Sequence, residues 1–128
     1  MTLENIILLT CLLVLIQIFI PIVIEQVFFK KIDLLYLISS RDKTIENSKY
    51  FNRGKRALSN LLETLPIFGL LVILSIFKEV DNLNLAALWL VLRAFYIPIY
   101  ILGINYLRTI LWFGATSCLI MIGVNFIY

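Results

Sequence analysis

Charged and polar side chains recur at helical spacing in two stretches of the chain that are otherwise rich in apolar residues. Steps of three, four and three residues place the first group on one face of a helix: Arg53, Arg56, Asn60 and Glu63. Steps of three and four do the same for Arg93, Tyr96 and Tyr100. Arginine binds carboxylates bidentately, and the two groups add a carboxylate, an amide and two phenols. Together they suit a small zwitterionic ligand with more than one carboxylate.

The elements that must position these side chains are predicted to be membrane-spanning helices. The chain has 128 residues, of which 62% are hydrophobic and 15% charged, and its mean hydropathy is +1.00. A soluble domain is nearer half apolar and a quarter charged, and about 20 apolar residues suffice to span a bilayer. We therefore expect an all-α integral membrane protein, one four-helix bundle domain over residues 1–128, with helices near 3–30, 51–77, 83–102 and 105–127.

Basic residues are concentrated between the first and second apolar stretches of the chain. They are Lys30, Lys31, Arg41, Lys43, Lys49, Arg53, Lys55 and Arg56. Under the positive-inside rule, this connection and the one between helices three and four lie in the cytoplasm, and both termini lie on the opposite side. Because the basic run is short, mixed with acids and flanked by apolar helices, we expect no nucleic-acid partner.

The chain offers little for metal binding or for a nucleophile of its own. It contains no histidine, and Cys11 and Cys118 lie in apolar stretches without a second ligand at metal spacing. We expect no metal site, and any nucleophile to come from the ligand. Ionisable residues at membrane depth favour a functional site. The alternative is a polar clamp, in which Arg56, Asn60 and Glu63 bond to one another and to Arg93 and only fix the helix register.

These residues resemble a known family. The run 53–68, RGKRALSNLLETLPIF, resembles the second-helix signature of the MAPEG family, the membrane-associated proteins of eicosanoid and glutathione metabolism. The run 93–112, RAFYIPIYILGINYLRTILW, is similar to the third and fourth helices of its short bacterial members. Ser40, Arg41 and Asp42 in the first loop also fit that branch. The resemblance covers roughly residues 41–112.

The resemblance implies a homotrimer of four-helix protomers that binds glutathione as co-substrate between neighbouring protomers, near the cytoplasmic face. The glutathione contacts that it implies are Arg56, Asn60, Glu63, Arg93, Tyr96 and Tyr100. It implies that Arg108 is catalytic and stabilises the glutathione thiolate. Further candidates are Lys31, Arg53 and Thr109. The chain departs from the prostaglandin E synthases at Ser59, Tyr96 and Thr109, where they carry arginine, histidine and serine, and is nearer the glutathione transferases and leukotriene synthases.

From this resemblance we expect a glutathione-dependent membrane enzyme that conjugates or reduces lipophilic electrophiles or hydroperoxides. Its other partners are lipids and a lipophilic substrate, and its location is a bacterial inner membrane. A noncatalytic lipid-binding or scaffold protein of the same fold is one alternative. A small four-helix drug exporter, with Glu25 as the carboxylate of its first helix, is another. The exporter leaves the basic motif of the second helix unexplained.

Overall fold

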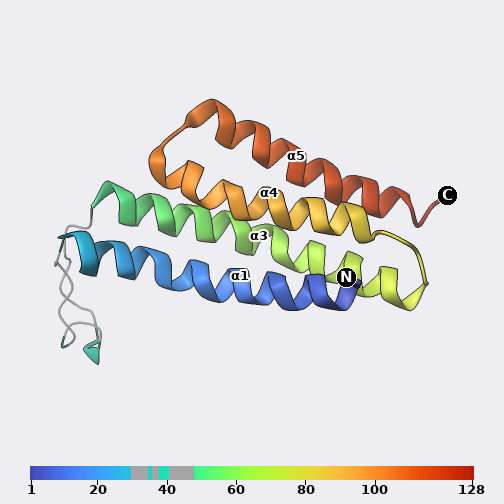
Figure 1. Ribbon diagram of the computed structural model, residues 1–128, viewed down its shortest axis with the longest axis horizontal. Helices are drawn as coiled ribbons and strands as arrows, with labels where there is room; N and C mark the ends of the chain where they lie inside the picture. The colour runs from blue at the N-terminus through green and yellow to red at the C-terminus, as the bar shows by residue number, and fades with distance from the viewer. Residues whose placement is uncertain (30–34, 36–37, 41–47) are drawn as a thin grey trace.

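The computed structural model describes residues 1–29, 35, 38–40 and 48–128. Its long helices are α1 (Leu3–Ile24), α3 (Lys49–Phe77), α4 (Leu83–Leu102) and α5 (Asn105–Val124), and α1 continues into a π-helical turn, η1 (Glu25–Phe29). The helices lie alongside one another in an elongated bundle (Figure 1). Four segments are long and apolar enough to cross a membrane, and the described residues contain no strand. The predicted all-α bundle of four membrane helices is confirmed.

Local sequence explains where the helices begin and end. Helix α3 begins at Lys49, before the predicted Phe51, because the hydroxyl of Ser48 accepts a hydrogen bond from the backbone N–H of Phe51 and caps the helix. Helix α4 ends at Leu102 and is capped by Gly103, whose φ of 79° is the left-handed conformation that glycine adopts without strain. This residue reverses the chain into α5, which ends at Val124, short of the predicted residue 127.

The helices do not pack equally against one another. Helix α1 packs on α3 and α4, and α4 packs most extensively on α5, whereas α3 and α5 make few contacts. The core includes Phe68 of α3 stacked on Trp89 of α4, with 3.8 Å between ring centroids. Cys118 is buried in this core and Cys11 is exposed on α1. The weak packing between α3 and α5 leaves room for a cavity between them.

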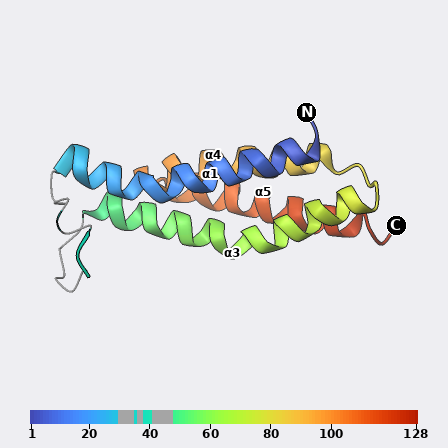
Figure 2. The same ribbon diagram turned by 90° about the horizontal axis from the view of Figure 1, so that it is seen from below.

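The two chain termini lie at one end of the bundle, and the start of α3 and the α4–α5 turn lie at the other (Figures 1 and 2). At the terminal end, Asn82 precedes α4 and is 1% exposed. Its amide nitrogen donates to the hydroxyl of Ser75 at 2.9 Å, and its amide oxygen accepts from Asn125 at 2.6 Å. One side chain therefore joins α3, the start of α4 and the residues after α5.

Replacing Asn82 with alanine tests this junction. Asn82→Ala removes two hydrogen bonds and leaves the buried Ser75 hydroxyl without its donor, so we expect a loss of about 1–3 kcal/mol in stability. The measurement is thermal unfolding of the protein in detergent. The matched control is Asn84→Ala, because Asn84 is exposed on α4 and its removal should leave the unfolding temperature unchanged. Equal effects of the two substitutions would contradict the junction.

Candidate functional site

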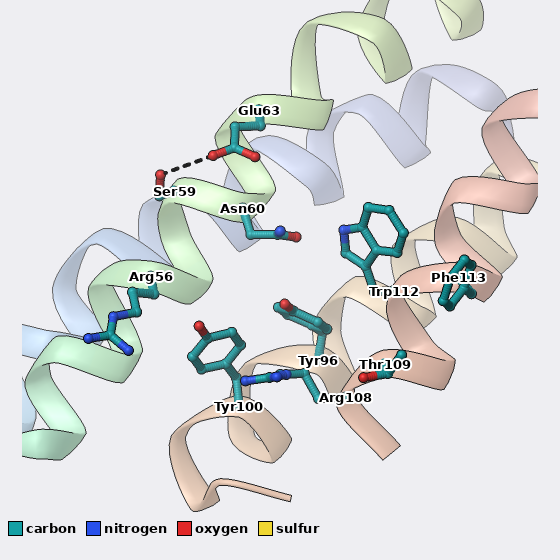
Figure 3. Close-up of a pocket in the computed structure, with 10 residues that line it drawn as sticks. All are labelled: Arg56, Ser59, Asn60, Glu63, Tyr96, Tyr100, Arg108, Thr109, Trp112 and Phe113. Atoms are coloured by element: carbon teal, nitrogen blue, oxygen red, sulfur yellow. Dashed lines mark hydrogen bonds between the residues drawn. The ribbon is translucent and has the colours of Figure 1, made fainter. Parts of the chain in front are cut away.

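A cavity of about 550 Å³ lies between α3, α4 and α5, at the end of the bundle that holds the α4–α5 turn. Its lining residues come from all three helices (Figure 3). They are Arg56, Ser59, Asn60, Glu63, Tyr96, Tyr100, Arg108, Thr109, Trp112 and Phe113. The structure thus brings together, within one protomer, most of the side chains that the sequence singles out.

Helical spacing and one tight turn produce this convergence. Arg56, Asn60 and Glu63 face the cavity because they follow one another at steps of four and three on α3. The turn at Gly103 folds α5 back along α4, and this brings Arg108 to Tyr100. The Arg108 guanidinium lies over the Tyr100 ring, 4.9 Å from its centroid, in the geometry of a cation–π contact. The contact with the Tyr100 ring therefore orients the guanidinium, and Arg108 itself lines the cavity.

Arg93 lies behind the cavity wall rather than on it. Its side chain is 2% exposed, and its guanidinium donates to the amide oxygen of Asn60 at 2.7 Å and to the hydroxyl of Thr64 at 2.9 Å. The same cation lies 5.6 Å from the ring centroids of Trp89 and Tyr96. Arg93 therefore joins α4 to α3, in agreement with the polar clamp interpretation for this one residue.

The bond from Arg93 determines what Asn60 offers to a ligand. Because the amide oxygen of Asn60 accepts from Arg93, its NH₂ group remains available as a donor to the cavity that Asn60 lines. The positive charge of Arg93 also favours the amide orientation in which the oxygen of Asn60, and not its nitrogen, faces the guanidinium. Asn60 should therefore recognise a carbonyl or carboxylate oxygen.

The charges on α3 are separated along the cavity. Glu63 accepts a hydrogen bond from the Ser59 hydroxyl at 3.4 Å, shown dashed in Figure 3. Arg56 lies two helical turns away, roughly 10 Å along the axis at 1.5 Å per residue. Within the part of the chain that the structure describes, no salt bridge joins Arg56 or Arg108 to a carboxylate. The cavity therefore presents two unpaired cations and one carboxylate to a ligand.

Arg53, one of the further candidates, lies away from the cavity. Its guanidinium donates to the backbone oxygen of Ile101 at 3.1 Å and packs on Gly103, where an added Cβ would lie 2.7 Å from its Nη1. A cation there complements the carbonyl groups at the end of α4. Lys31 lies outside the described residues. Glu25, the exporter candidate, is fully buried and accepts from the backbone N–H and the hydroxyl of Ser48, so it stabilises the start of α3.

The model of the MAPEG family matches residues 6–128 of the chain. The chain belongs to the MAPEG family. No curated protein and no solved structure matches it. Family membership and the four candidate spans together make it a multi-pass integral membrane protein. The MAPEG family includes glutathione-dependent enzymes and noncatalytic members. Membership alone therefore does not determine the activity of this chain.

Two aromatic residues line the cavity without having been predicted as site residues from the sequence. Trp112 and Phe113 line it from α5, with their rings edge to face at 5.2 Å (Figure 3). They lie one helical turn after Arg108 and Thr109, so a spacing of four residues could have found them. Ser59 was noted only as a departure from other members, and it bonds to Glu63. The aromatic pair gives the cavity an apolar side opposite the charges of α3.

Substitution of Arg93 tests its role in holding Asn60. Arg93→Lys keeps the charge, but an ammonium cannot replace the planar fork that reaches both Asn60 and Thr64, so we expect stability to fall by about 2 kcal/mol. Arg56→Lys is the matched control, because Arg56 is exposed on the cavity wall. Thermal unfolding in detergent measures both. An unfolding temperature that falls equally for the two variants, or for neither, would contradict this role.

Proposed function

We propose that this MAPEG protein is a glutathione-dependent membrane enzyme that conjugates or reduces lipophilic electrophiles or hydroperoxides. The observation that carries the proposal is the position of Arg108. It shares one cavity with Arg56, Asn60 and Glu63 on one side and with the aromatic pair Trp112 and Phe113 on the other. A polar tripeptide and a lipophilic partner would therefore meet at a permanently charged guanidinium.

The polar side of the cavity fits glutathione by charge and by hydrogen bonding. Glutathione has two carboxylates, one ammonium group and two peptide bonds. Arg56 supplies a cation for a carboxylate, Glu63 an anion for the ammonium group, and Asn60 an NH₂ donor for an oxygen. Tyr96 and Tyr100 add phenolic hydroxyls. The cavity volume of about 550 Å³ lies within the usual range for small-molecule sites.

Arg108 is the group best placed to favour an ionised thiol. A free thiol has a pKa near 8.5 and is only a few per cent thiolate at neutral pH. Lowering that pKa by about two units requires roughly 2.7 kcal/mol, which one or two charge-assisted hydrogen bonds supply. Bound glutathione would provide the thiolate nucleophile, because neither Cys11 nor Cys118 lines the cavity. Arg108 would then stabilise the negative charge of the thiolate, and the cation–π contact with Tyr100 orients Arg108.

The aromatic side suits the second substrate. Trp112 and Phe113 offer ring faces to a lipophilic electrophile or hydroperoxide. Phe113 and Ile110, on the same helix, are exposed on the outside of the protomer, where the bilayer supplies lipophilic molecules. An apolar substrate could therefore reach Arg108 along α5 without crossing the polar side of the cavity.

The proposal extends to assembly and orientation. We propose a homotrimer with the cavity near the cytoplasmic face, both termini on the opposite side, in a bacterial inner membrane. The basic residues Lys49, Arg53, Lys55 and Arg56 support this orientation, because they lie at the end of α3 that carries the cavity. The termini lie at the other end of the bundle (Figure 1).

Replacing Arg108 tests the proposed chemistry. Titrating glutathione into the wild-type protein at pH 7 should give a saturable ultraviolet absorbance of the thiolate. We expect Arg108→Ala to abolish this signal and to lower turnover of a generic electrophile about 25-fold at pH 7, the ratio of the thiolate fractions for a thiol pKa of about 6.5 and one of about 8.5. The turnover of the variant should recover as the pH rises towards 8.5, where free thiol ionises without help.

Lys55→Ala is the matched control for loss of one positive charge. Lys55 is exposed on α3, with its ammonium 5.7 Å from the Phe51 ring and outside the cavity. It should leave both the absorbance and the turnover unchanged. A thiolate signal that survives in Arg108→Ala would reject this residue as the stabiliser. Binding of glutathione by the wild type without any thiolate signal would favour the noncatalytic lipid-binding or scaffold alternative.

A further inference from the structure

A second cavity, separate from the proposed glutathione site, lies at the same end of the bundle. Its volume is about 320 Å³, and it is lined by Ile24, Phe28, Tyr50, Ile101 and Leu102. These residues come from the end of α1, the turn η1, the start of α3 and the end of α4. The lining is almost wholly apolar, so its natural content is hydrocarbon rather than water or a polar metabolite.

Two cations border this apolar cavity. The ammonium of Lys49 lies 5.1 Å from the ring centroid of Tyr50, which lines it. The guanidinium of Arg53 donates to the backbone oxygen of Ile101, another lining residue, and packs against Gly103. Arginine has five N–H donors, so this one bond leaves others for an anion. The neighbouring Glu25 carboxylate is buried and bonded to Ser48.

The apolar cavity and the cations beside it match the two parts of an anionic phospholipid, its acyl chain and its phosphate. An apolar cavity within the membrane lies beside two cations where helix α3 begins, and arginine and lysine are the residues that bind phosphate. Basic residues between membrane helices at a cytoplasmic interface recognise anionic headgroups. We propose that this cavity binds one acyl chain of an anionic phospholipid, whose phosphate lies between Lys49 and Arg53.

The lipid would also contact residues next to those that line the proposed active site. Arg53 lies one helical turn before Arg56, and Ile101 follows Tyr100 directly, while Arg56 and Tyr100 both line the larger cavity. A bound chain therefore fills the space behind the last turn of α4 and stabilises the wall that presents Tyr100. This inference does not depend on glutathione, because none of the described residues lines both cavities.

The test compares phosphatidylglycerol with phosphatidylcholine of the same acyl chains, each titrated into the full-length protein in detergent. Native mass spectrometry counts bound lipid, and thermal unfolding reports stabilisation. We expect saturable binding of one phosphatidylglycerol per protomer with a rise in unfolding temperature, and weaker binding of phosphatidylcholine. Lys49→Gln should weaken phosphatidylglycerol binding about fivefold, whereas Lys55→Gln, which removes an equal charge from the same helix, should not.

A second pair of variants tests the cavity itself. Leu102→Trp should fill it and remove saturable binding, and because Leu102 is largely exposed the substitution should not disturb helix packing. Leu107→Trp, on α5 outside this cavity, should have no effect. Equal binding of the two lipids would reject recognition of the headgroup charge. Unchanged binding by Leu102→Trp would reject the cavity as the site, and either result overturns the proposal.

Discussion

The guanidinium of Arg93 lies inside the bundle, and the geometry of the larger cavity depends on its two hydrogen bonds to α3. A charged group at membrane depth is stable only where protein groups replace its water. Asn60 and Thr64 do so for Arg93, which is 2% exposed. A shift of α4 along α3 would break both bonds, so the cation fixes the register of the two helices. That register places Tyr96 and Tyr100 opposite Arg56.

The four arginines of helices α3, α4 and α5 show how position decides the role of one residue type. Arg93 is buried and structural, and Arg53 complements the carbonyl end of α4 at Gly103. Arg56 and Arg108 line the cavity and are not paired with a carboxylate in the described residues. Arg93 and Arg53 thus stabilise the packing of the helices, and Arg56 and Arg108 face the larger cavity. Arg56 and Arg108 can therefore exchange water for a ligand anion in the larger cavity at no cost to the fold.

Much of this arrangement could be predicted from the sequence because it follows from periodicity. Hydropathy indicated the four helices, and steps of three and four placed Arg56, Asn60 and Glu63 on one face, which lines the cavity. The same rule put Arg93 with Tyr96 and Tyr100 but could not show that its long side chain turns to α3, because this depends on a partner in another helix. Trp112 and Phe113 obeyed the rule as well, yet aromatic residues in a membrane helix carry no distinguishing signal of function. Contacts between protomers and the choice of a lipophilic substrate would depend on surfaces that a single protomer's pattern does not encode.

The central claim is that the cavity binds glutathione as the thiolate, and a count of protons tests it most directly. Calorimetric titration of glutathione in two buffers of different ionisation enthalpy gives the number of protons released on binding. At pH 7 the free thiol is about 3% ionised, and a pKa lowered by about two units would leave about three quarters of the bound thiol ionised, so we predict the release of about 0.7 proton per bound glutathione. S-methylglutathione, which has no ionisable thiol, should bind without this release. Glutathione that binds without releasing a proton would contradict the account, because Arg108 would then not be stabilising a thiolate.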